Sequence, residues 1–211
     1  MSAKGLLLIG VLIVLVLSAV AIINSQIHST TPVTRHTATF NFDTGYPPLT
    51  QTQTTPFNQT STNITAYFSS PSDTASSPAF SITSQATTSF QLSQFSGQYL
   101  YDNKPSRDIL DIKFSSEILD VRFTFATIEH QNQAITVPSD ILLTGYANTK
   151  LVGSLKASGS FSADSYPQGT ISFYPGLPFN WIRISLPSQT SGTTDFLVDN
   201  IIVTIVSKPT P

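Results

Sequence analysis

From Phe40 onward, apolar and polar residues alternate along the chain with a period of two. The alternation comes in short stretches rich in β-branched and aromatic residues, such as DVRFTFATI and NWIRISLP. Successive side chains of a strand point to opposite faces of a sheet, so this period is typical of strands with one buried face. We predict strands at residues 38–42, 63–68, 79–83, 89–95, 108–114, 120–128, 140–147, 150–157, 169–175, 180–187 and 196–206.

Residues that favour turns separate these stretches. They are Pro71, Pro78, the DNKP cluster at 102–105, Asn148-Thr149, Gly159, Pro167, Gly176 and Gly192. No stretch after Ile23 carries apolar residues at helical spacing over ten residues. The pattern therefore predicts an all-β fold, an antiparallel β-sandwich formed by one domain at 40–206. The Thr-rich stretch QTQTTPFNQTSTNIT has few large apolar residues, and we interpret it as an exposed loop.

The alternation also predicts which side chains share a face. In NWIRISLP, Trp181 and Arg183 lie opposite Ile182 and Ile184, so Trp181 is expected to point outward beside Arg183. In FLVDNIIVTIV, strict alternation gives one face to Leu197, Asp199, Ile201, Val203 and Ile205, and the other to Phe196, Val198, Asn200 and Ile202. Asp199 thus falls in line with aliphatic residues, where an uncompensated carboxylate costs several kcal/mol or becomes protonated. We expect it to have a partner.

The N-terminal segment has a different pattern. The segment from Gly5 to Ile23 contains no charge and only Ser18 as a polar side chain. As a helix, this segment is long enough to cross ~30 Å of hydrocarbon. We predict one N-terminal transmembrane helix within residues 1–23, a linker at 24–39 and a C-terminal tail at 207–211. Lys4 precedes the apolar run, which predicts a cytoplasmic N-terminus and an extracytoplasmic β domain.

Two other fates of this segment stay open. Ala19 and Ala21 form an A-x-A pattern, so cleavage after Ala21 would make the protein secreted, although the apolar run exceeds the ~15 residues usual for a signal peptide. Lys4-Gly5 before the apolar run also resembles the processing site of archaeal type IV pilin precursors, but the Glu common early in those helices is missing.

Composition excludes several function classes. The chain of 211 residues has a net charge of −2 and 10% charged residues. It therefore lacks the excess of basic residues that is typical of nucleic-acid-binding proteins, and we predict no nucleic-acid partner. It has no cysteine, and hence no disulfide, thiolate metal site or cysteine nucleophile. His130 beside Glu129 is the one histidine of the predicted domain, and no catalytic motif is present. We predict that the chain is not an enzyme and has no catalytic residues.

The order of four segments resembles that of the galactose-binding-like jelly-roll domains. These segments are DILDIKFSSEILDVRFTFAT, ILLTGYANTKLVGS, QGTISFYPGLPFNWIRISL and the closing FLVDNIIVTI with its Asp-Asn pair. The resemblance implies a jelly-roll sandwich, a fold that hosts carbohydrate, lipid and protein binding and also purely structural modules. It also implies a structural Ca²⁺ held by Asp199 and by Asp43 of FNFDTG. The alternative is that Asp199 and Asn200 hydrogen-bond a neighbouring loop without metal.

Aromatic residues near polar ones are candidates for a sugar-binding surface, because aromatic faces stack on sugar rings while amides and carboxylates bind hydroxyls. We single out Tyr99, Tyr101, Asp102, Asn103 and Trp181 as ligand-binding residues, from a wider set that also includes Tyr146, Tyr166 and Tyr174. Packing within the core or on a sheet surface is the competing explanation for each aromatic. Asn58 and Asn63 begin N-x-[ST] sequons, which are either glycosylation sites or chance matches in a Thr-rich chain.

These observations leave two functional hypotheses. The first is a membrane-anchored extracytoplasmic binding module for carbohydrate or another cell-surface polymer. The second is a structural surface protein, such as a pilin-like filament subunit or an envelope component, whose β domain contacts only other proteins.

Overall fold

The computed structural model describes residues 34–84, 92–103, 108–129, 136–162, 165–187, 193 and 195–207. Residues 35–206 form one compact unit. The strands are β1 (Thr34–Phe40), β2 (Phe57–Ser61), β3 (Ile64–Ser69), β4 (Phe80–Ser84), β5 (Gln98–Asp102), β6 (Leu110–Thr127), β7 (Asp140–Ala147), β8 (Lys150–Ser158), β9 (Ser160–Ser162), β10 (Ser165–Phe173), β11 (Phe179–Ser185) and β12 (Phe196–Ser207). All the strand pairs with a determined register are antiparallel, and the described residues contain no helix.

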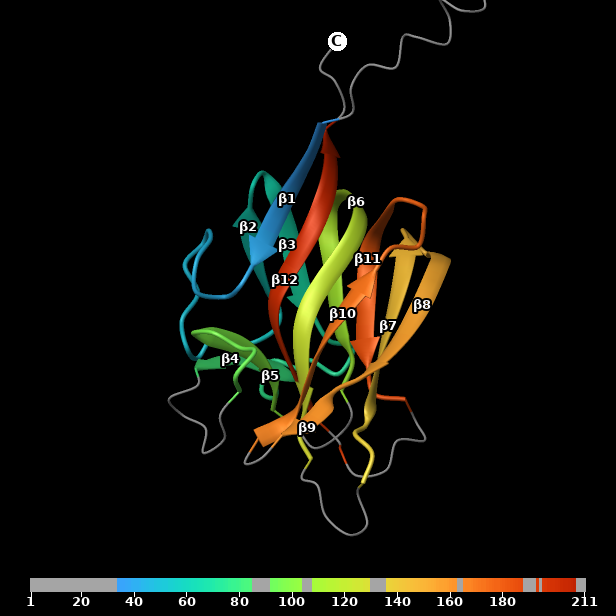
Figure 1. Ribbon diagram of the computed structural model, residues 1–211. Coiled ribbons are helices and arrows are strands. Elements are labelled where there is room, and N and C mark those ends of the chain that lie inside the picture. Colours follow the sequence, from blue (N-terminus) through green and yellow to red (C-terminus); the bar gives the residue numbers. More distant parts are fainter. Residues whose placement is uncertain are drawn as a thin grey trace, which may run out of the picture. The chain divides into compact units, whose positions relative to one another are not determined.

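The long strand β6 joins two layers of sheet. Its first half pairs with β3 and β11, which gives a first layer in the order β2-β3-β6-β11-β7-β8. Its second half pairs with β10 and β12, which gives a second layer in the order β9-β10-β6-β12-β5-β4, with β1 also pairing with β12. In Figure 1, β1 begins and β12 ends at the same end of the domain.

The core lies between the two layers. Ile112, Ile182 and Ile184 of the first layer and Phe123 and Phe125 of the second belong to one buried cluster. Their neighbours along β6 and β11 are Lys113, Trp181, Arg183 and Arg122, none of which belongs to the core. The predicted antiparallel sandwich and the outward direction of Trp181 and Arg183 are thus confirmed.

Several element predictions were wrong. β2 lies within the stretch interpreted as a loop, and its Phe57 and Gln59 are buried. The described part of the predicted strand 89–95, Leu92 to Phe95, is not a strand. The two strands predicted at 108–114 and 120–128 are one strand, β6. β1 begins at Thr34, inside the range predicted as linker.

The predicted facing of β12 was also wrong, because a β-bulge interrupts it. The pairing with β6 shifts register between Asp199 and Ile202, and Asn200 has a left-handed φ of 52°. Asn is one of the few residues that adopt this conformation readily, and an extra residue in a bulge reverses the facing of all residues after it. Phe196, Val198, Ile201 and Val203 consequently share the core. Asp199 therefore lies on the outer face of the second layer.

The predicted membrane helix lies outside the described residues. Within the described part of the chain, no helix is long and apolar enough to span a bilayer.

Candidate functional site

The outer face of the first layer carries a row of side chains that crosses five neighbouring strands. Tyr67 of β3 is paired with Lys113 of β6, Lys113 with Trp181 of β11, Trp181 with Tyr146 of β7, and Tyr146 with Leu151 of β8. Directly opposed residues of adjacent strands point to the same face. With strands about 4.8 Å apart, the row extends over roughly 19 Å. We call it the aromatic row.

The row next to it is charged. Asp111 of β6 lies opposite Arg183 of β11. The Arg183 guanidinium donates from Nε to Asp111 Oδ1 and from Nη2 to Oδ2, both at 2.8 Å. This two-pronged hydrogen bond raises the pKa of Arg183 above its usual value. The charge of Asp111 is thereby neutralised within the protein.

Trp181 is held in place from several sides. Its Nε1 donates to Asp111 Oδ1 at 3.1 Å, and its ring stacks on Tyr146 with centroids 4.4 Å apart. Lys113 Nζ and the Arg183 guanidinium carbon each lie 5.2 Å from the Trp181 ring centroid. Because these contacts already fix the Trp181 ring, the side chain loses little rotamer entropy when a ligand binds. Tyr67, with 48% of its surface exposed, is the open ring of the row.

A hollow of about 400 Å³ lies at the Tyr67 and Trp181 part of this face. Its lining consists of Tyr67, Lys113, Phe114, Asn148, Thr149, Asn180 and Trp181. Asn148 and Asn180 are hydrogen-bonded to each other, since Asn180 Oδ1 accepts from the Asn148 backbone N–H and Asn180 Nδ2 donates to Asn148 Oδ1. Asn148 has a φ of 57° in the turn between β7 and β8, where Asn is well suited. The hydrogen bonds fix the amide groups at the rim.

This combination of aromatic rings, amides and a lysine suits a flat polyhydroxylated ligand. Rings can stack on the apolar faces of sugars, and amide and ammonium groups can bind their hydroxyls. The described residues contain no group of three or more His, Cys, Asp or Glu side chains able to hold a metal ion.

The structure separates the ligand-binding residues predicted from sequence. Tyr99, Tyr101 and Asp102 belong to β5 in the second layer, whereas Trp181 belongs to β11 in the first. Tyr99 and Asp102 are fully buried, so their role as ligand contacts was wrong. Burial and nearby acids raise the pKa of Tyr101, which packs against the cluster around Tyr99. Asn103 is exposed, and its Oδ1 accepts a hydrogen bond from Ser81 Oγ.

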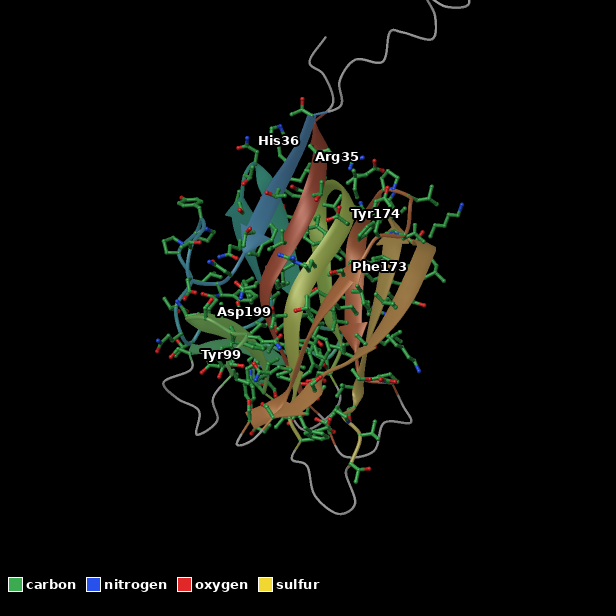
Figure 2. The ribbon with its side chains drawn as sticks, viewed as in Figure 1. Arg35, His36, Tyr99, Phe173, Tyr174 and Asp199 are labelled. Carbon is green, nitrogen blue, oxygen red and sulfur yellow. The ribbon has the colours of Figure 1, made fainter. Side chains whose placement is uncertain are left out.

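Tyr99 is buried because a segment covers the outer face of the second layer. Leu92 and Phe95 pack there with Tyr99, Ala126 and Leu197 into a second apolar cluster. The Phe95 and Tyr99 rings meet edge to face with centroids 5.5 Å apart. We call residues 92–97 the covering segment. Figure 2 shows Tyr99 and Asp199 on the same side of the domain.

Asp43 and Asp199 hold the end of the covering segment. Asp199 Oδ2 accepts from the Ser96 backbone N–H at 3.0 Å, and Asp43 Oδ1 accepts from the Gln98 backbone N–H at 2.8 Å. Asp199 also accepts from the backbone N–H and Nδ2 of Asn200. Burial raises the pKa of Asp199 to about 7, the Ser96 and Asn200 N–H groups lower it, and the charge of Asp43 raises it. The partner expected for Asp199 is thus a loop.

The same two carboxylates are the predicted calcium ligands, and their donor chemistry fits a hard cation that prefers oxygen. Hydrogen bonds reach three of their four oxygens, and none is found on Asp43 Oδ2 among the described residues. No described Lys or Arg forms an ion pair with either carboxylate. The ion pair found among the described residues joins Arg183 and Asp111 of the first layer. The site offers only two side-chain ligands of the six to eight that Ca²⁺ takes.

Sequence reasoning missed Tyr67, Lys113, Asn148 and Asn180. Each is an ordinary surface residue of its own strand or turn, and only the register of four strand pairs brings them to Trp181. The one available signal was the outward facing of Trp181 beside Arg183.

Comparisons with solved structures find similar folds at low sequence identity. A cyclase from Fischerella sp. TAU is 10% identical, with a TM-score of 0.48, over 83% of this chain and 100% of that one. The K1 cleaved adhesin domain of Lys-gingipain from Porphyromonas gingivalis W83 is 9% identical, with a TM-score of 0.42, over 80% and 97%. The module TmCBM61, solved in complex with beta-1,4-galactotriose, is 10% identical, with a TM-score of 0.39, over 80% and 99%.

No family model and no curated protein matches the sequence. The neighbours include carbohydrate-binding modules and adhesin domains. They also include enzymes, so the prediction that this chain is not an enzyme stays a prediction. At these identities and TM-scores, the geometry of the chain itself has to carry any functional argument.

Proposed function

We propose that the chain is a carbohydrate-binding module that uses the outer face of the first layer, with the N-terminal segment anchoring it to a membrane and the β domain extracytoplasmic. The observation that carries the proposal is the aromatic row beside the hollow. An exposed ring at Tyr67, a fixed ring at Trp181 and the hydrogen-bonded amides of Asn148 and Asn180 surround one depression.

The order of strands explains why this face would serve as the site. The row runs across the strands rather than along one, so the sandwich sets the spacing of its members and no loop has to close. A preformed surface avoids the entropy cost of ordering loops when a ligand binds. A polymer could lie across several strands and contact successive side chains.

The test compares two exposed tyrosines. Tyr67→Ala removes the open ring of the row, whereas Tyr174→Ala removes a ring that is 65% exposed but lies outside the lining of the hollow. We expect Tyr67→Ala to weaken polysaccharide binding about tenfold, since aromatic contacts contribute on the order of 1 kcal/mol or more. Tyr174→Ala should bind like the wild type. Affinity electrophoresis of the full chain in detergent, against a panel of soluble polysaccharides, gives both values. The proposal would be rejected if both variants lost affinity equally, or if no polysaccharide retarded the wild-type protein.

A structural Ca²⁺ near Asp43 and Asp199 is a second proposal, supported by two adjacent carboxylates without a cationic partner among the described residues. Bound there, the ion would supply compensating charge and tie the covering segment to β12. Thermal melting with 1 mM CaCl₂ and with excess chelator, on the order of conditions used for weak extracellular sites, provides the test. A higher midpoint with calcium supports the ion, and identical midpoints leave the hydrogen bonds as the complete explanation.

The alternative function, a subunit of a filament or envelope, draws support from the edge of the first layer. β8 is the last strand of that layer, and its Leu151 and Leu155 are 58% and 37% exposed. Unpaired edges with apolar side chains favour strand addition by another chain, although Lys150 and Lys156 on the same strand oppose it. Analytical ultracentrifugation over a hundredfold range of concentration separates the two functions, because a filament subunit would assemble and a binding module would not.

A further inference from the structure

The charges on the outer face of the first layer are unevenly distributed, and their placement bears on the kind of polymer that the proposed module would take. Following the register, Lys113, Arg183 and Lys156 are outward cations, Asp111 and Asp140 are outward acids, and Glu117 of β6 is also exposed. Arg183 and Asp111 neutralise each other through two hydrogen bonds. Asp140 accepts from Ser158 Oγ at the far end of β7, three side-chain rows away from Tyr146.

Lys113 is the cation at the hollow. It lies in the aromatic row between Tyr67 and Trp181, it is exposed, and it lines the depression. Among the described residues the one ion pair uses Arg183 and Asp111, so Lys113 has no carboxylate partner there. Its ammonium instead lies over the Trp181 ring. Both Asp111 oxygens already accept hydrogen bonds, Oδ1 from Arg183 Nε and Trp181 Nε1, and Oδ2 from Arg183 Nη2.

We propose that the ligand of this face is an anionic polysaccharide, in which a carboxylate or sulfate group binds Lys113 while the neighbouring ring stacks on Tyr67. The inference rests on the proposed carbohydrate-binding function and specifies its ligand class. The Lys113 ammonium can donate hydrogen bonds to the hydroxyls of any sugar, but only an anionic sugar also offers a carboxylate or sulfate acceptor of opposite charge, which makes the hydrogen bond an ion pair. The Lys113 ammonium lies over the Trp181 ring, and the neighbouring acid Asp111 is paired with Arg183. The charge of Lys113 is therefore not neutralised by these groups.

The positive charge of Lys113 at the hollow is opposite in sign to the net charge of the whole chain. The net charge is −2, so general attraction to polyanions is not expected from the protein as a whole. A preference for anionic polymers would therefore have to come from the hollow. This gives the proposal a sharp control: Lys156, which carries the same charge on the same face, lies on β8 two rows beyond the aromatic row and does not line the hollow.

The experiment measures dissociation constants of the full chain in detergent for matched polymers. Polygalacturonate and galactan form one pair, which tests a carboxylate. Dextran sulfate and dextran form the other, which tests a sulfate. Wild type, Lys113→Gln, Lys156→Gln and Tyr67→Ala are compared at low and at high salt. We expect the wild type to bind at least one anionic polymer about tenfold more tightly than its neutral partner, and Lys113→Gln to lose most of that difference.

The outcomes separate the two levels of proposal. Preference for carboxylate or for sulfate that Lys113→Gln abolishes and Lys156→Gln preserves supports the inference and names the anionic group. Equal binding of charged and neutral polymers, with a loss in Tyr67→Ala, overturns the inference and leaves the proposed function standing. Equal effects of Lys113→Gln and Lys156→Gln point to diffuse attraction and overturn it as well. Binding of no polymer by any variant overturns the proposed function itself.

Discussion

The outer faces of the two layers have opposite fates in the same molecule. On the first layer, Tyr67, Lys113 and Trp181 stay accessible around a hollow. On the second, Tyr99 and Leu197 are buried beneath Leu92 and Phe95 of the covering segment. Both faces carry aromatic residues, so aromatic content alone does not mark a binding surface. What distinguishes them is whether the chain itself supplies the apolar partner.

The covered face also shows what fixing such a segment requires. Its backbone N–H groups at Gln94 and Ser96 donate to Gln168 Oε1 and Asp199 Oδ2, and the N–H of Gln98, the first residue of β5, donates to Asp43 Oδ1. Buried N–H groups of a loop need acceptors, and here side chains from distant parts of the chain provide them. On the outer face of the first layer, Asp111, the acid next to the aromatic row, is instead hydrogen-bonded to Arg183 and Trp181.

The largest expected contrast between the faces is in stability. Phe95→Ala removes a ring that is 6% exposed from the second cluster, so we expect the free energy of unfolding to fall by about 3 kcal/mol. Tyr67→Ala removes a half-exposed ring from the open face and should change it by less than about 0.5 kcal/mol. Urea titration followed by tryptophan fluorescence measures both. Comparable losses would mean that Tyr67 is a packing residue, which would also weaken the proposed binding site.

A smaller contrast concerns the glycine that lets the covering segment approach Asp43. Gly97 has a φ of 65°, and a Cβ there would lie 2.2 Å from Asp43 Oδ2. Gly97→Ala should therefore destabilise the fold by about 2 kcal/mol, through backbone strain and displacement of the carboxylate. Gly176→Ala is the matched control, because Gly176 also has a positive φ of 79° but nothing lies within 4 Å of its Cβ position.

The control should cost only the strain, about 1 kcal/mol. Urea midpoints of the two variants, compared at equal m-values, give the difference. If the two substitutions cost the same, the contact between Gly97 and Asp43 contributes nothing to holding the segment.

The alternation of the sequence predicted the open face better than the covered one. Trp181 and Arg183 follow a regular strand, β11, so their outward direction could be predicted. Asp199 could not be placed, because the bulge at Asn200 reverses the facing of β12 and no periodicity announces a left-handed residue. The covering segment has apolar residues at the spacing of a strand, which led to the wrong strand prediction. Only its packing on Tyr99 shows that it is a loop that covers the second layer. The aromatic row was likewise beyond prediction, because it depends on register between strands far apart in sequence.

A further contrast appears in the dependence of stability on pH. The pKa of Asp199 rises from 3.8 to about 7 in the folded protein, mainly because the group is buried. Between these two values the folded state binds more protons than the unfolded state, so the free energy of unfolding falls as pH rises. The contribution of Asp199 is fully present below pH 3.8 and is lost as pH rises toward about 7. We expect a slope of about 1 kcal/mol per pH unit from this group in chelator.

Asp199→Asn should remove that slope, whatever its effect on absolute stability, because the amide does not titrate. The open face provides the control: Asp111→Asn changes an acid that is already paired with Arg183, and it should leave the slope in place. Urea midpoints at pH 5, 6, 7 and 8 measure the slopes. A wild type whose stability instead rises with pH, and does so only when calcium is added, would show that an ion and not a proton compensates Asp199, since metal binding favours the ionised carboxylate. The covered face would then be fixed by a cation, and the two faces would differ in the cofactor they need as well as in their packing.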